Sequence, residues 1–155
     1  MLKPGDRAPD FTLPDQDGRN ITLAQLLEDG ALVLYFYPAD FTPGCTKEAC
    51  TIRDMHDDIA AAGMRVVGIA PQDAASHARF RDKHGLQFTL LADADKSVIK
   101  AFGVDGPLGI GVRRATFLIG ADGIVRDAVL ADIRIGRHEE FIRAAITAAP
   151  ASGKP

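Results

Sequence analysis

Two cysteines carry the most distinctive chemistry in this sequence. Cys45 and Cys50 are the only cysteines in the 155-residue chain. Where thiols stay reduced, such a pair is better interpreted as redox, catalytic or buried groups than as a disulfide framework. A thiolate is a nucleophile, whereas a buried thiol is only a small apolar side chain. The position of each sulfur therefore decides what chemistry is open to it.

The segment before Cys45 predicts that this residue lies in the first turn of a helix. Thr42 is a good N-cap residue and Pro43 suits the first helical position, which places Cys45 at the third. Unpaired backbone N–H groups and the positive end of the helix dipole favour a thiolate over a thiol there. We therefore interpret Cys45 as a candidate nucleophile.

Cys50 lies further along the same expected helix. An offset of five residues rotates it by about 140° and puts the two Cα atoms about 8–9 Å apart, beyond the ~7 Å limit for a disulfide. A bond between Cys45 and Cys50 therefore requires local unwinding of the helix. From this spacing alone, two buried thiols without a redox role remain an alternative.

Hydrophobic patterning predicts the elements that hold these thiols. The apolar run 31–37, ended by Pro38, predicts a strand buried on both faces, and 64–70 predicts a second strand. Apolar positions three and four residues apart predict a helix over 43–62 between them. Strand, helix and strand then form a parallel βαβ unit.

The remaining elements complete an α/β fold. Helices are expected over 74–84, 96–102 and 138–148, a strand over 89–92, a hairpin over 115–119 and 124–129, and an N-terminal hairpin over 11–13 and 21–23. This order predicts a thioredoxin-like fold, with a central mixed β-sheet flanked by helices and an N-terminal β-hairpin. We expect residues 1–149 to form a single domain and 150–155 a flexible C-terminal tail.

Composition argues against several classes of function. Lys and Arg number 18 against 21 Asp and Glu, a net charge of −3 without a basic stripe, so no nucleic-acid partner is expected. The longest apolar run is too short to cross a bilayer, which predicts a soluble protein without a membrane partner. No secretory signal is visible, so we expect a cytoplasmic location. The four histidines (56, 77, 84 and 138) lack ligand spacing, and neither a metal nor another cofactor is expected.

Three separated segments carry motifs with fixed spacing. The run 35–50 contains a complete Pro-x-x-x-Thr-x-x-Cys pattern, formed by Pro38, Thr42 and Cys45. This run resembles the active-site segment of the peroxiredoxins. Residues 5–11 resemble the amino-terminal signature of that family, and 114–119 resemble its arginine-bearing strand. The second cysteine, five positions after the first, is similar to the bacterioferritin comigratory protein or peroxiredoxin Q branch.

The resemblance implies a thiol-dependent peroxidase acting on hydrogen peroxide and organic hydroperoxides. It implies that Cys45 is the peroxidatic cysteine, which is oxidised to a sulfenic acid. Cys50 is then the resolving cysteine, which converts that acid to an intramolecular disulfide. Thioredoxin or a similar dithiol reductant restores both thiols by exchange. Relatives of this branch also imply a monomer.

The resemblance further implies which groups bind the peroxide. The donors are the Thr42 hydroxyl, the backbone N–H groups of Gly44 and Cys45, and the Arg114 guanidinium, while Pro38 shields the pocket from water. A solvent-exposed cation is the alternative for Arg114. Strand alternation puts neighbouring residues 113 and 114 on opposite faces, so only one can point at the sulfur, and the family register selects Arg114.

Two residues on the predicted helix are expected to support the site, and one alternative function remains open. Glu48 and Arg53 are expected to orient the pocket as supporting partners, with an exposed ion pair on the helix as the alternative. The alternative function is a redox-sensing protein that uses a Cys45–Cys50 switch to control partner binding. Steady consumption of peroxide distinguishes an enzyme from such a sensor.

Overall fold

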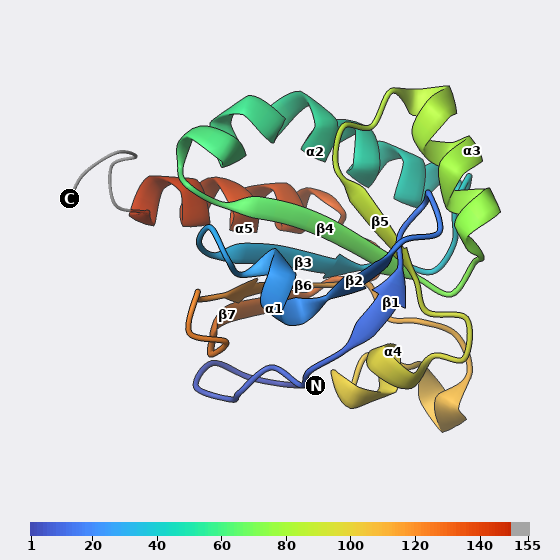
Figure 1. Ribbon diagram of the computed structural model, residues 1–155, viewed down its shortest axis with the longest axis horizontal. Helices are drawn as coiled ribbons and strands as arrows, with labels where there is room; N and C mark the ends of the chain where they lie inside the picture. The colour runs from blue at the N-terminus through green and yellow to red at the C-terminus, as the bar shows by residue number, and fades with distance from the viewer. Residues whose placement is uncertain (150–155) are drawn as a thin grey trace.

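A five-stranded mixed sheet forms the centre of the computed structural model, which describes residues 1–149 (Figure 1). Its strand order is β5-β4-β3-β6-β7. β4 (Arg65–Ala70) lies parallel to β3 (Leu32–Phe36), and β5 (Thr89–Ala92) lies parallel to β4. β6 (Ala115–Ile119) pairs antiparallel with β3, and β7 (Val125–Leu130) antiparallel with β6. The predicted mixed sheet is confirmed.

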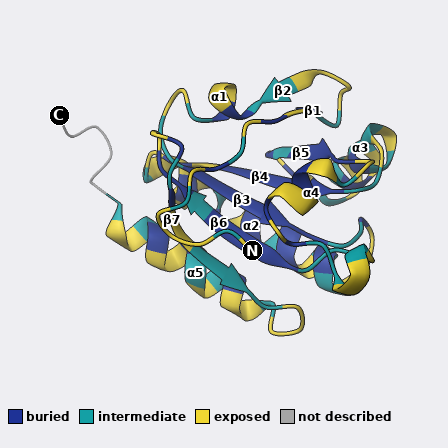
Figure 2. Ribbon diagram, turned by 90° about the horizontal axis from the view of Figure 1, so that it is seen from below, coloured by how far each residue is buried: buried dark blue, intermediate teal, exposed yellow. Residues whose placement is uncertain are grey.

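Helices cover both faces of this sheet, which explains why β3 is apolar throughout. α2 (Pro43–Ala61), α3 (Ala74–His84) and α5 (Gly136–Ala148) contribute to the core on one face, where Val33 and Tyr35 point. α1 (Leu23–Leu26), α4 (Ser97–Ala101) and the N-terminal strands contribute to the other, where Leu32 and Leu34 point. Figure 2 shows the buried sheet between these layers. The predicted flanking helices are confirmed.

The predicted N-terminal hairpin is also confirmed, with one correction. β1 (Thr12–Pro14) pairs antiparallel with β2 (Asn20–Thr22). Leu23, which we predicted to end the second strand, instead begins α1. The Thr22 hydroxyl accepts from the Gln25 N–H, while the Gln25 side chain accepts from the Thr22 N–H. This capping box satisfies N–H groups at the start of a helix, and so turns the chain out of the strand.

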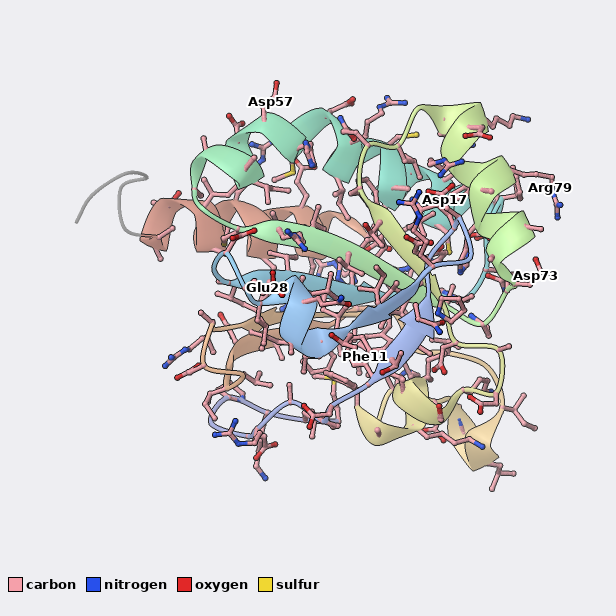
Figure 3. The ribbon with its side chains drawn as sticks, viewed as in Figure 1. Phe11, Asp17, Glu28, Asp57, Asp73 and Arg79 are labelled. Carbon is pink, nitrogen blue, oxygen red and sulfur yellow. The ribbon has the colours of Figure 1, made fainter. Side chains whose placement is uncertain are left out.

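The predicted positions of the longer helices hold, although several ends move. α5 begins at Gly136, two residues before the expected start, and a short 3₁₀ turn (Pro107–Gly109) lies between α4 and β6. Asp57 on α2 and Arg79 on α3 project outward from the exposed helix faces (Figure 3).

Within residues 1–149, no helix is both long and apolar enough to span a bilayer. The single domain stays a prediction, and the predicted tail at 150–155 lies outside the described residues.

Sheet pairing brings distant parts of the chain to one place. Phe36 at the end of β3 pairs with Ala115 at the start of β6. Arg114, just before β6, therefore lies beside the loop that leads from β3 into α2. α5 packs on α2 and closes the same region from the helical layer.

Candidate active site

Cys45 occupies the third position of α2, as predicted. Thr42 is the N-cap, Pro43 follows it, and the first regular helical hydrogen bond runs from the Thr46 N–H to the Thr42 carbonyl at 2.8 Å. The Thr42 hydroxyl does not cap the helix, because it donates to the Ala39 carbonyl at 3.0 Å instead. The backbone N–H groups of the first turn, next to Cys45, are therefore not used by this side chain.

Arg114 brings its guanidinium to the Cys45 sulfur. Its Nη2 lies 3.2 Å from Cys45 Sγ, and its Nη1 donates to Glu48 Oε1 at 2.7 Å. Burial opposes the charged guanidinium, but Glu48 and Cys45 together outweigh burial and raise the pKa of Arg114. Arg113 points elsewhere and pairs with Asp132 at 2.7 Å. The two arginines thus lie as strand alternation predicts.

Gly44 allows this close approach of helix and arginine. A Cβ atom at position 44 would lie 2.9 Å from Ile135 Cδ1 and 3.2 Å from Arg114 Nη2. Both distances are shorter than an ordinary van der Waals contact. Only a residue without a side chain fits between Arg114 and the loop before α5 unless its neighbours move.

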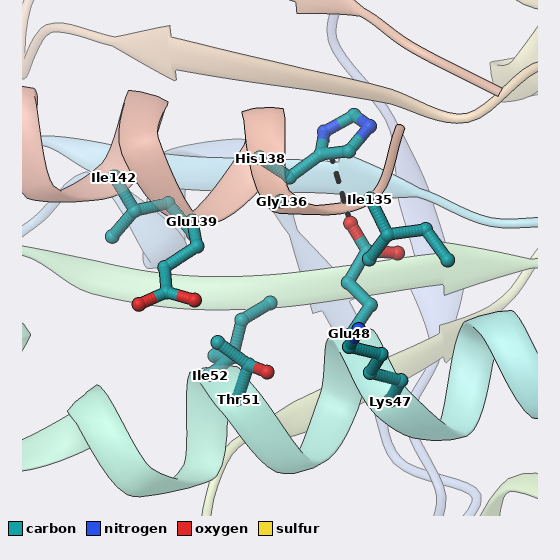
Figure 4. Close-up of a pocket in the computed structure, with 9 residues that line it drawn as sticks. All are labelled: Lys47, Glu48, Thr51, Ile52, Ile135, Gly136, His138, Glu139 and Ile142. Carbon is teal, nitrogen blue, oxygen red and sulfur yellow. Dashed lines mark ion pairs between the residues drawn. The ribbon is translucent and has the colours of Figure 1, made fainter. Parts of the chain in front are cut away.

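Glu48 is buried and contacts Arg114, while its supporting role stays a prediction. Its side chain is 2% exposed, and its Oε2 atom lies 3.7 Å from His138 Nδ1 (Figure 4). Burial raises the pKa of Glu48 to about 7, although the charge and hydrogen bond of Arg114 act in the opposite direction. Near neutral pH this carboxyl therefore holds a proton in part of the molecules.

His138 is the principal site residue that the sequence did not reveal as functional. It lies in the first turn of α5 and is buried. Its Nδ1 is 2.8 Å from the Thr116 hydroxyl, and its Nε2 is 2.9 Å from the Ala131 carbonyl. Burial is the main cause that lowers the pKa of His138. One sequence signal exists: His138 lies four residues before Ile142, on the apolar stripe of the helix.

Tyr35 adds a buried hydroxyl to the same region. Gly68 on β4 leaves space for its ring, because a Cβ atom there would lie 2.8 Å from Tyr35 Cζ. Burial raises the pKa of Tyr35 well above its ordinary value, and the negative charges of Glu48 and Cys45 act in the same direction. Among the described residues, three buried side-chain polar atoms lack a hydrogen-bond partner: Tyr35 Oη, Glu48 Oε2 and Arg114 Nε. Hydrogen-bonding capacity is thus concentrated around Cys45.

The predicted supporting role of Arg53 is wrong in its geometry. The Arg53 guanidinium donates to Asp54 Oδ1 at 3.0 Å and to the His84 carbonyl at 2.8 Å, away from the cluster. Five residues separate it from Glu48 on α2, so the two side chains point in directions about 140° apart. The supporting partner of Arg114 is therefore Glu48.

Both cysteines lie on the predicted helix, and Pro38 precedes it. Cys45 is buried, Cys50 is half-buried, and both are free thiols on the continuous helix α2. Pro38 is half-buried, and its carbonyl accepts from Gln72 Nε2 at 3.2 Å. Within residues 1–149, no group of three or more His, Cys, Asp or Glu side chains is placed to hold a metal ion.

A second buried network holds the loop that precedes α2. Asp40 accepts from the Tyr37 hydroxyl at 2.7 Å, from the Ser76 hydroxyl at 2.7 Å, and lies 2.6 Å from His77 Nδ1. His77 Nε2 lies 3.0 Å from the Leu91 carbonyl. These contacts fix the loop to α3 and β5 at Asp40, five residues before Cys45.

Fold and site together define a thioredoxin-like protein with a buried thiol at the start of a helix, in contact with an arginine. The AhpC/TSA family profile matches residues 4–128. A putative peroxiredoxin of Mycobacterium tuberculosis strain H37Rv is 48% identical over 128 residues, covering 79% of this chain and 81% of the relative. Peroxiredoxin Bcp of Escherichia coli K12 is 42% identical over 147 residues, covering 91% and 93%. The chain belongs to the AhpC/TSA family of peroxiredoxins.

Solved structures agree with this assignment. The crystal structure of peroxidoxin BcpB from Mycobacterium tuberculosis superposes with a TM-score of 0.91 at 39% identity, covering 97% of this chain and all (100%) of that one. Peroxiredoxin Q of Xanthomonas campestris gives a TM-score of 0.83 at 30% identity, covering 96% of each chain. The family resemblance and the thioredoxin-like fold are confirmed, and family membership supports thiol-dependent peroxidase activity.

Proposed function

We propose that this protein reduces hydrogen peroxide and organic hydroperoxides through Cys45. The observation that carries the proposal is the 3.2 Å contact between Arg114 Nη2 and Cys45 Sγ at the start of α2. A guanidinium at that distance stabilises a thiolate and also the negative charge that develops on a departing oxygen. A thiol surrounded only by hydrocarbon has neither advantage.

The first chemical step oxidises Cys45 by two electrons. The thiolate attacks one peroxide oxygen, the O–O bond breaks, and the departing oxygen takes a proton to leave as water or an alcohol. Arg114 and the N–H groups of Gly44 and Cys45 stabilise the developing charge, and the Thr42 hydroxyl joins them by turning away from the Ala39 carbonyl, while Pro38 limits access of water. The product on the protein is a Cys45 sulfenic acid.

The second step forms a disulfide with Cys50. The Cys50 sulfur attacks the sulfenic sulfur, a S–S bond forms, and water leaves. Both residues belong to one helix, so we propose that the first turns of α2 unwind before this bond forms. Thioredoxin or a similar dithiol then reduces the disulfide by thiol exchange and completes the cycle.

We also propose that residues 1–149 form one catalytic unit that acts as a monomer. This unit would act in the cytoplasm, where glutathione and thioredoxin keep thiols reduced between turnovers. Sedimentation of the reduced and oxidised protein tests the monomer.

A coupled assay with thioredoxin, thioredoxin reductase and NADPH tests the cycle. We expect steady consumption of peroxide by the wild type and none by Cys45→Ser. Cys50→Ser is the matched variant: it should still react once with peroxide, but should neither form a 45–50 disulfide by mass spectrometry nor turn over. Stoichiometric oxidation of the wild type without turnover would instead favour the redox sensor.

A further inference from the structure

The buried site contains two acidic groups for one permanent cation. Cys45 and Glu48 both contact Arg114, and the three residues are 1%, 2% and 5% exposed. If Cys45 and Glu48 are both ionised, the cluster carries a net negative charge. Such a charge is costly in a medium that water does not reach. A proton held close to Glu48 removes this cost.

His138 lies where it can hold that proton. Its Nδ1 is 3.7 Å from Glu48 Oε2, which is the carboxylate oxygen without a hydrogen-bond partner among the described residues. Figure 4 shows His138 on α5 facing the Glu48 carboxyl on α2. His138 Nε2 faces the Ala131 carbonyl, an acceptor, and so carries a hydrogen in either protonation state. His138 Nδ1 also lies 2.8 Å from the Thr116 hydroxyl, which can accept from a protonated Nδ1 and donate to an unprotonated one. His138 Nδ1 can therefore gain or lose a proton without breaking either contact.

We propose that His138 is a positioning residue for the peroxidase reaction, sharing with Glu48 the proton that offsets the Cys45 thiolate. This inference rests on the proposed function. With the proton on either partner, the Glu48–His138 pair has no net charge, and the Arg114 charge is available to the sulfur and the departing oxygen. When the shared proton is absent, the Glu48 carboxylate, 2.7 Å from Arg114, cancels much of the Arg114 charge.

The groups around the pair are compatible with this assignment. Burial raises the pKa of Glu48 and lowers that of His138, so both shifts favour the uncharged pair. Arg114 before β6 and Arg137 on α5 also lower the pKa of His138, while Asp132, in the loop before α5, raises it.

The remaining groups near the pair come from the strand below and from the cavity beside it. Tyr35 on β3 stays neutral, because burial raises its pKa well above the ordinary value. Lys47 and Glu139 line a cavity that also borders Glu48 and His138 (Figure 4). Lys47 is exposed, and Glu139 is paired with Arg143 at 2.9 Å.

The test is the pH profile for oxidation of Cys45 by hydrogen peroxide in a single turnover without reductant. We expect the wild-type rate constant to fall at alkaline pH, when the shared proton leaves. His138→Gln keeps a donor for the Ala131 carbonyl, whereas His138→Asn keeps an amide on the Nδ1 side. Neither amide can take the Glu48 proton. In both variants the fall in rate should therefore begin about one pH unit lower, so that the rate constant is about tenfold smaller than that of the wild type at a fixed pH in the falling part of the profile.

His56→Asn on α2 is the matched control, because His56 is half-buried and outside the cluster. Its profile should equal that of the wild type. An unchanged profile in both His138 variants, or an equal loss of rate at every pH, would overturn the proposal and leave His138 a purely structural residue.

A second measurement uses the wild-type protein, so it does not depend on whether the His138 variants fold. The His138 imidazole signals, followed by NMR across the pH range, should titrate at a different pH after peroxide oxidises Cys45. An unchanged titration would also overturn the proposal. Failure of wild-type Cys45 to react with peroxide would contradict the proposed function itself, and is thus distinguishable.

Discussion

Two buried polar clusters lie at the start of α2 and differ in how completely they are hydrogen-bonded. The anchor cluster consists of Tyr37, Asp40, Ser76 and His77, and both carboxylate oxygens and both imidazole nitrogens have partners. The thiol cluster consists of Cys45, Glu48, Arg114 and His138. Two of its side-chain atoms, and the hydroxyl of the adjacent Tyr35, have none.

This difference distinguishes a structural network from the one at which we propose the peroxide reaction. A complete network fixes one geometry, and the anchor cluster holds the loop in which Phe41 adopts a left-handed backbone with φ of 66°. An incomplete network keeps donors and acceptors for a reacting molecule. The carboxyl pKa values differ accordingly: burial dominates and raises that of Glu48, whereas burial of Asp40 is outweighed by hydrogen bonds from His77, Tyr37 and Ser76, which lower its pKa.

The largest effect is expected for Arg114→Lys in the thiol cluster. Lysine keeps the charge but has a single terminal nitrogen, so it cannot reproduce the contacts that Nη1 and Nη2 of Arg114 make with Glu48 and Cys45. We expect the rate constant of the peroxide reaction to fall by about 10²–10³-fold, measured by stopped-flow in a single turnover. Arg113→Lys is the control, since its ion pair with Asp132 is solvent-exposed. Equal losses in both variants would contradict the assignment.

Asp40→Asn should affect stability instead of chemistry. Removing the charge of a buried, hydrogen-bonded carboxylate should lower the free energy of unfolding by about 3 kcal/mol near neutral pH. Because the pKa of Asp40 is lower in the folded protein, its stabilisation is present above the unfolded pKa of about 4 and is lost as the pH falls through the folded value. Urea unfolding at several pH values measures this.

The exposed pair Asp122–Arg126 supplies the control for that experiment. Asp122→Asn should change the free energy of unfolding by less than about 0.5 kcal/mol. A large loss of peroxide reactivity in folded Asp40→Asn, with normal stability, would remove the distinction between the two clusters.

Glu48→Gln should abolish a pH dependence of the opposite sign and smaller amplitude, which Glu48 gives the wild type. A carboxyl whose folded pKa is raised to about 7 stabilises the fold below its unfolded pKa, and this contribution is lost as the pH rises toward the folded value. In the wild type this should lower the free energy of unfolding by about 2 kcal/mol between about pH 5 and about pH 7. The glutamine variant should lack this decline. An identical slope in both proteins would show that Glu48 ionises normally.

Local rules made much of this structure predictable from the sequence. The Thr42-Pro43 helix start placed Cys45 correctly, and strand alternation separated Arg113 from Arg114, because both depend on neighbours in the chain. The hairpin pattern did not predict α1. It extended the second strand to Leu23, whereas the Thr22 capping box ends the strand and starts a helix there.

The tertiary contacts of the site were beyond such rules. His138 joins the thiol cluster, and Tyr35 lies beside it, only when α5 and β4 pack against their neighbours. The spacing of His138 from Ile142 places it on the apolar side of its helix but does not indicate which residues it meets there. Arg53 failed for the same reason: its helix was predicted correctly, but the contacts with Asp54 and His84 that direct its side chain were not.

The sequence separation of Arg114 from Cys45, 69 residues, bears on how the protein is made. At about 5–20 residues per second, a ribosome adds those residues in about 3–14 s. Throughout that interval the nascent thiol has no guanidinium beside it. We therefore expect the proposed reactivity of Cys45 toward peroxide to develop only after Arg114 has been added to the chain.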